Sequence, residues 1–133
     1  MKARILLVDD DVSIREGLAL YLLSDLGDKL VIAEAGSGNE AIRLLDEGLR
    51  FDVIVSDYSM NDGSGADLLR HVNEYFPSIP FILFTSMIEP VLPRVTGNFV
   101  GVVEKPDFKR LKRKIIEAIC LSSAVARKKF VSK

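Results

Sequence analysis

Five short apolar runs alternate with segments of helical periodicity, and this alternation restricts the fold more than any other feature of the chain. The runs fall at residues 4–8, 30–35, 52–56, 81–85 and 99–103. Between and after them, apolar residues recur three or four positions apart, as on one face of a helix. Parallel strands joined by helices are buried on both faces, which continuous apolar runs require. The sequence therefore predicts an α/β fold with a doubly wound, five-stranded parallel sheet.

The starts of two helices and the weakness of a third can also be predicted. Ser13–Glu16 and Ser37–Glu40 have the spacing of a capping box, in which a serine and a glutamate close the first helical turn. The last and longest apolar stripe runs over residues 108–119. Residues 86–98 contain Pro90, Pro93 and Gly97, which interrupt helices. We therefore expect the fourth helix to be short or irregular.

Composition narrows the class of protein. With 133 residues, 48% of them hydrophobic, the chain has the size of one domain with a proper core. No apolar run approaches the roughly 18 residues of a membrane span, and the first ten residues reach acidic side chains too early for a signal peptide. Cys120 is the single cysteine, so no internal disulfide forms, which fits a reducing cytoplasm.

Polar residues follow four of the five predicted strands. Asp9 and Asp10 end the first strand, Asp57 the third and Thr85 the fourth, and Lys105 follows the fifth. In an open α/β sheet, ligands bind outside the carboxyl ends of the strands, so these side chains should converge on one edge. Three carboxylates there need a positive partner, and Mg²⁺ suits a site of few carboxylates plus water and phosphate. Asp11, the third acid of this run, is expected to start the helix or face solvent.

This set of residues, with Pro106, resembles the receiver domain of bacterial two-component response regulators over residues 3 to about 120. The resemblance implies a flavodoxin-like fold with strand order 2-1-3-4-5. It implies that Asp57 accepts a phosphoryl group, that Thr85 bonds a phosphoryl oxygen, and that Lys105 pairs first with the acceptor and then with the phosphoryl group.

Further roles are carried over by position. Asp9, Asp10, Asp57 and the backbone carbonyl of Ser59 match the protein ligands of the metal. Pro106 matches a proline whose preceding peptide bond is often cis in the family.

Four further positions concern the switch and the surrounding loops. They are Gly65, Ser86, Met87 and Val102. Gly65 closes the loop after the third strand, and Met87, like Ser59, stands where the family tunes the lifetime of the phosphoryl group. Val102 departs from the family, which usually carries an aromatic residue there. Asn61 replaces a common proline, so we expect a looser loop.

The resemblance also implies partners. A sensor histidine kinase or a phosphotransfer protein would donate the phosphoryl group, and an output domain or target protein would use the face formed by the fourth helix, fifth strand and fifth helix. A homodimer is a further expectation, whereas no membrane partner is expected. The basic run at 109–114 lacks aromatic residues and a recognition motif, so direct nucleic-acid binding is not expected.

The sequence leaves the C-terminal end of the expected domain open. Residues 1–120 form the expected receiver domain, and residues 121–133 are either a helical extension or the start of a linker to an output domain.

Two other functions compete with a regulator that catalyses only its own phosphorylation and dephosphorylation. One is a Mg²⁺-dependent aspartyl-phosphate phosphohydrolase, although such enzymes usually place an aspartate where Ser59 stands. The other is a pseudo-receiver that binds partners without phosphorylation, although such proteins usually lose the acceptor, the acidic pair or the lysine.

Overall fold

A five-stranded parallel sheet forms the centre of the molecule in a computed structural model that describes residues 2–87, 89–94 and 97–122. Its strands are β1 (Ala3–Val8), β2 (Leu30–Ala35), β3 (Val53–Ser56), β4 (Phe81–Thr85) and β5 (Phe99–Glu104). They lie in the order β2-β1-β3-β4-β5, and every neighbouring pair is parallel. The predicted fold class and strand order are confirmed.

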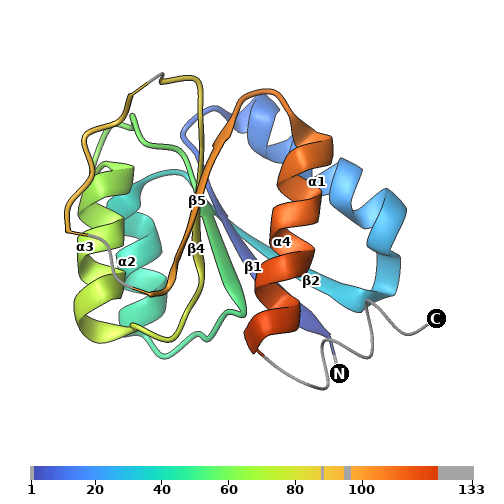
Figure 1. Ribbon diagram of the computed structural model, residues 1–133, viewed down its shortest axis with the longest axis horizontal. Coiled ribbons are helices and arrows are strands. Elements are labelled where there is room, and N and C mark those ends of the chain that lie inside the picture. Colours follow the sequence, from blue (N-terminus) through green and yellow to red (C-terminus); the bar gives the residue numbers. More distant parts are fainter. Residues whose placement is uncertain (1, 88, 95–96, 123–133) are drawn as a thin grey trace.

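In the part of the chain that the structure describes, four α-helices cover the sheet, two on each face. They are α1 (Val12–Leu26), α2 (Gly38–Asp46), α3 (Gly65–Tyr75) and α4 (Phe108–Ser122), with a short 3-10 turn, η1, at Gly27–Lys29. Figure 1 shows α2 and α3 together on one side of the strands and α1 and α4 on the other. Within the described residues, no helix is both long and apolar enough to cross a membrane.

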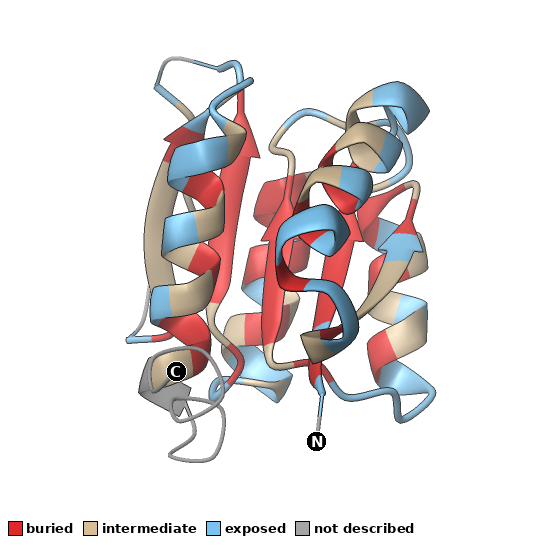
Figure 2. Ribbon diagram, turned by 90° about the vertical axis from the view of Figure 1, so that its right-hand side faces the viewer, coloured by how far each residue is buried: buried red, intermediate tan, exposed pale blue. Residues whose placement is uncertain are grey.

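The apolar run of β1 is continuous because both faces of the strand are buried. Ile5 and Leu7 pack in the core under α1 and α4, whereas Leu6 and Val8 pack in the core under α2 and α3. Successive side chains of a strand point to opposite faces, so an unbroken run fills two cores. Figure 2 shows the central strands as a buried layer between helices whose outer faces are exposed, whereas the edge strands β2 and β5 are only partly buried.

The first helix begins earlier than predicted. Its N-cap is Asp11, whose Oδ1 accepts a hydrogen bond from the Ile14 N–H at 3.2 Å. Ser13 already lies inside the helix, so the capping box predicted there is wrong, and the expectation that Asp11 starts the helix is correct. The second predicted start is confirmed, because Ser37 Oγ accepts from the Glu40 N–H at 3.0 Å.

The connection between β4 and β5 is irregular, as its prolines predict. Residues 86–87, 89–94 and 97–98 of this connection form no helix. The last predicted helix is therefore α4, which packs Leu111, Ile115 and Ile119 against the sheet. Of the predicted extension at 121–133, residues 123–133 lie outside the described residues.

Candidate functional site

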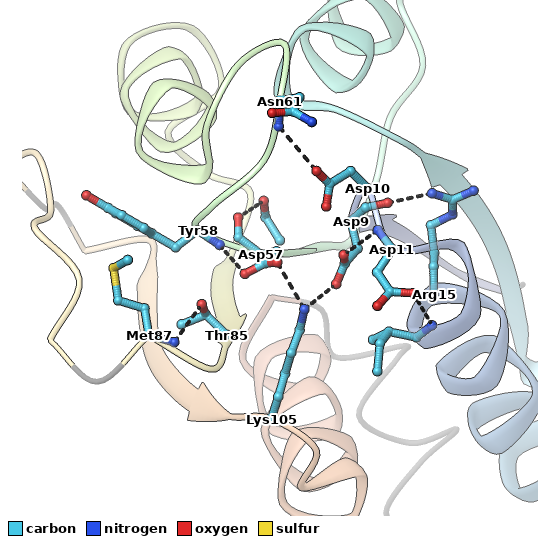
Figure 3. Close-up of polar contacts among 12 residues, drawn as sticks. Asp9, Asp10, Asp11, Arg15, Asp57, Tyr58, Asn61, Thr85, Met87 and Lys105 are labelled. Atoms are coloured by element: carbon cyan, nitrogen blue, oxygen red, sulfur yellow. Dashed lines mark hydrogen bonds and ion pairs between the residues drawn. The ribbon is translucent and has the colours of Figure 1, made fainter.

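Three carboxylates meet where β1 and β3 end. Asp9 and Asp10 follow β1, and Asp57 follows β3. The two strands are adjacent and in register, with Val8 opposite Ser56, and the Asp57 N–H donates to the Val8 carbonyl at 2.9 Å. One carboxylate oxygen of each aspartate lies within 4.8 Å of the others. The predicted convergence of these residues on one edge of the sheet is what the structure shows (Figure 3).

Lys105, the residue after β5, reaches across to two of these carboxylates. Its Nζ lies 2.7 Å from Asp9 Oδ2 and 3.0 Å from Asp57 Oδ2. Burial raises the pKa of Asp9, although hydrogen bonding from Lys105 acts against this rise. Burial alone would lower the pKa of Lys105, but its hydrogen bonds to the two carboxylates outweigh burial and raise it. The lysine is therefore held as a cation, and the peptide bond between it and Pro106 is cis, as expected.

Backbone N–H groups orient each carboxylate. The Asp11 N–H donates to Asp9 Oδ1 at 2.9 Å, the Tyr58 N–H donates to Asp57 Oδ1 at 2.7 Å, and the Asn61 N–H donates to Asp10 Oδ2 at 3.2 Å. Hydrogen bonds to ionised acceptors are about twice as strong as neutral ones. These donors were not predicted, because nearly every residue carries a backbone N–H and only the fold selects those that face the site.

One side chain of the site was also missed. Arg15 donates from Nη1 to the backbone carbonyl of Asp9 and from Nε to Glu34 Oε1 at 2.7 Å. Its side chain is 16% exposed, so its guanidinium group lies against the backbone of Asp9 rather than in solvent. Only its position one turn into α1 could have suggested this role.

Hydrogen bonds tie the loop after β3 to the start of α2. Asp62 accepts hydrogen bonds from Ser37 Oγ at 3.2 Å and from Asn39 Nδ2 at 2.9 Å. Gly65 closes the loop, and a Cβ at this position would overlap the backbone carbonyl of Asp57. Asn61 supplies an N–H donor to Asp10 that a proline would lack, and the looser loop expected from this exchange stays a prediction.

The remaining predicted residues lie on β4, on β5 or in the loops that follow the strands. Thr85 ends β4, is 2% exposed, and accepts a hydrogen bond on Oγ1 from the Met87 N–H at 3.2 Å. Ser59, Ser86 and Met87 are exposed in the loops after β3 and β4. Val102 is half-buried within β5, where it pairs with Leu83 of β4. The individual roles of these residues stay predictions.

The donor set fits a hard divalent cation. All three clustered ligands offer carboxylate oxygens, which Mg²⁺ prefers over nitrogen or sulfur ligands. With Lys105 as the paired cation, three carboxylates and one ammonium leave a formal charge of -2. Asp9, Asp10 and Asp57 could therefore hold a metal ion that removes their mutual repulsion.

A half-buried carboxylate beside an acidic pair and a lysine, at the carboxyl edge of a doubly wound sheet, is the arrangement of a phosphoacceptor-type signalling domain. Residues 5–116 match the family model described as the response regulator receiver domain. The chain therefore belongs to the receiver domain family of two-component response regulators.

Individual relatives agree with this assignment. The chain is 36% identical over 89 residues to response regulator protein VraR of Staphylococcus aureus, a match that covers 67% of the chain and 42% of VraR. It thus spans less than half the length of this relative. The response regulator TrrA of Thermotoga maritima, solved in complex with Mg²⁺ and BeF, is 28% identical with a TM-score of 0.76 over 89% of this chain and 99% of TrrA. The chemotaxis response regulator CheY4 of Vibrio cholerae shares the fold, with 24% identity and a TM-score of 0.67 over 92% of this chain and all of CheY4 (100%).

Proposed function

We propose that the chain accepts a phosphoryl group on Asp57 from a phosphohistidine and thereby switches the activity of an output. The observation that carries this proposal is the placement of the Asp57 carboxylate within reach of both an acidic pair and Lys105. TrrA, crystallised with Mg²⁺ and BeF, supports it as a structural relative whose complex combines the metal with a phosphoryl-like group.

The transfer follows from charge and position. A carboxylate oxygen of Asp57 attacks phosphorus as the bond from phosphorus to the histidine nitrogen breaks, and the imidazole leaves with the electron pair. Lys105 neutralises charge on the transferred oxygens, and Thr85 donates its hydroxyl to one of them. Mg²⁺, held by Asp9, Asp10, Asp57 and the Ser59 carbonyl, would supply charge neutralisation when bound. Later attack of water on phosphorus restores the carboxylate and releases phosphate, so the chain catalyses only reactions of its own phosphoryl group.

The proposed partners are a phosphoryl donor and an output domain. The donor is a sensor histidine kinase or a phosphotransfer protein in the cytoplasm. VraR is more than twice as long as the matched region, and residues 121–133 are proposed to be either a helical extension or the start of a linker to an output domain.

A phosphohydrolase acting on a separate substrate is the second candidate, and Ser59 argues against it. Aspartyl-phosphate phosphohydrolases usually place an acidic proton donor two residues after the nucleophile, and a serine hydroxyl cannot replace it at neutral pH. The pseudo-receiver alternative is opposed by the intact pair of Lys105 with Asp57.

Intact-mass measurement after incubation with acetyl phosphate and Mg²⁺ tests the proposed function. The wild-type chain should gain the mass of one phosphoryl group, and the gain should vanish with EDTA or in Asp57→Ala. If Asp57→Ala still gains this mass, the acceptor is another residue and the proposal is wrong.

A further inference from the structure

The connection between β4 and β5 rests on the side chain of Tyr58. The Tyr58 hydroxyl donates a hydrogen bond to the Val91 carbonyl at 2.7 Å. Its ring and the side chain of Leu92 are both half-buried against the core under α2 and α3. Residues 89–94, which we call the β4–β5 strap, are therefore held at their middle by the residue that follows Asp57.

The same residue contacts the phosphoacceptor from its other end. The Tyr58 N–H donates to Asp57 Oδ1 at 2.7 Å, while Asp57 Oδ2 faces Lys105. Figure 3 shows the Tyr58 side chain extending away from the carboxylates toward the side on which Thr85 and Met87 lie. One rigid aromatic residue thus joins the carboxylate to the strap through two short hydrogen bonds.

Phosphorylation changes the first of these bonds. An ionised carboxylate becomes a neutral acyl group, whose charge now lies on the phosphoryl oxygens. The hydrogen bond from the Tyr58 N–H then has a neutral acceptor and loses about half of its strength. The backbone of Tyr58 therefore has a direct contact with Asp57 through which it can respond to phosphorylation.

The strap has the freedom to follow. It is anchored before its start by the bond from the Met87 N–H to Thr85 Oγ1, at 3.2 Å, and at its end by Asn73 Nδ2 to the Arg94 carbonyl, at 2.9 Å. Between these anchors, Val91 is 78% exposed. Because the Tyr58 hydroxyl holds the carbonyl of this exposed residue, a shift of Tyr58 repositions the middle of the strap.

We propose that Tyr58 transmits the phosphorylation state of Asp57 to the β4–β5 strap through its bond to Val91. In this chain Tyr58 takes over the signalling role of the aromatic residue that the family usually carries at the position of Val102. The inference rests on the proposed phosphorylation of Asp57, and it makes the exposed strap the surface whose shape reports the signal.

The exchange Tyr58→Phe tests this role, because it removes the hydroxyl and keeps the ring that packs in the core. The reporter is the backbone amide of Leu92, which is bonded covalently to the Val91 carbonyl; Pro90 and Pro93 have no N–H. ¹H–¹⁵N spectra are recorded with Mg²⁺ before and after acetyl phosphate, and intact mass is measured on the same samples. Tyr75→Phe, which removes a hydroxyl from a residue that is 61% exposed on α3, is the matched control.

The wild type and Tyr75→Phe should gain the phosphoryl mass and shift the Leu92 amide. Tyr58→Phe should gain the same mass, while its Leu92 shift falls to the level seen in Asp57→Ala under the same conditions. If Tyr58→Phe gains the mass and keeps the full Leu92 shift, or if the phosphorylated wild type shows no shift, the inference is wrong and the proposed function stands. If the wild type gains no mass, the proposed function fails and the inference fails with it.

Discussion

Replacing Lys105 by methionine measures how strongly one ammonium group stabilises the acidic cluster. Its Nζ lies 2.7 Å from Asp9 Oδ2 and 3.0 Å from Asp57 Oδ2, and the three side chains are at most 13% exposed. Methionine keeps the apolar stem and removes the charge. Removing one partner of a buried ion pair costs about 3–5 kcal/mol. We expect a loss of about 2–4 kcal/mol at neutral pH without metal, because Asp9 can relieve part of the repulsion by binding a proton. For a chain of this size, that loss lowers the melting temperature by roughly 10 °C.

The pH dependence of this loss has a defined sign. Burial already raises the pKa of Asp9, and hydrogen bonding from Lys105 opposes the rise, so the pKa of Asp9 should rise further in Lys105→Met. A folded-state pKa above the unfolded one means that the unfolded chain ionises first as pH increases. Stability of the variant therefore falls from the ordinary aspartate pKa of 3.8 upward, until pH passes the raised value. The difference from the wild type should be small in acid and largest near neutral pH.

Thermal melting in EDTA at several pH values, followed by addition of Mg²⁺, measures both the loss of stability in Lys105→Met and its pH dependence. Mg²⁺ should raise the melting temperature of Lys105→Met more than that of the wild type, because a bound cation stabilises the folded state and no lysine competes for the carboxylates. Lys109→Met, at an exposed position on α4, serves as the control and should change little. A Lys105→Met variant as stable as the wild type at neutral pH in EDTA would refute the electrostatic reasoning.

Three further predictions use matched pairs of variants. Asn61→Pro removes the N–H that donates to Asp10 and should weaken Mg²⁺ binding by about tenfold in calorimetric titration. Asn61→Ala keeps this N–H and should leave the affinity unchanged. Equal affinities of the two variants would contradict the assigned contact. Asp11→Ala should cost about 1 kcal/mol in chemical denaturation through loss of the N-cap, and Ser13→Ala should cost almost nothing; the reverse order would restore the capping box at Ser13. Gly65→Ala should destabilise the fold by roughly 1–3 kcal/mol through overlap with backbone, while Gly17→Ala, where a Cβ meets nothing closer than 3.9 Å, should stabilise α1 by about 0.5–1 kcal/mol; no difference between the two glycines would contradict the packing at the first.

The fold could be predicted because its signals are local or periodic. An unbroken apolar run such as 5–8 has one solution in an α/β domain, burial on both faces, and its side chains fill two cores in the structure. The start of α1 was harder, since Asp11 and Ser13 both cap helices well and only the backbone shows which of them is extended.

The acidic residues and the lysine of the site were predictable, whereas Arg15 and the backbone donors were not. Asp9, Asp10, Asp57 and Lys105 could be placed together because parallel strands bring their carboxyl ends to one edge. The donors at Tyr58 and Asn61 could not, because their N–H groups carry no sequence signal and their orientation depends on the loop after β3. The hydroxyl of Tyr58 reaches the β4–β5 strap for a similar reason, since this contact joins residues 33 positions apart.

A crystal structure with Mg²⁺ and beryllofluoride tests the central claim most directly, because it shows the acceptor, the metal and the responding groups together. We predict a beryllofluoride adduct on a carboxylate oxygen of Asp57, a metal ion bound by Asp9, Asp10 and Asp57, and contacts from Lys105 and Thr85 to the fluorides. An adduct on another residue, or a cleft that binds neither group at saturating concentrations, would contradict the account.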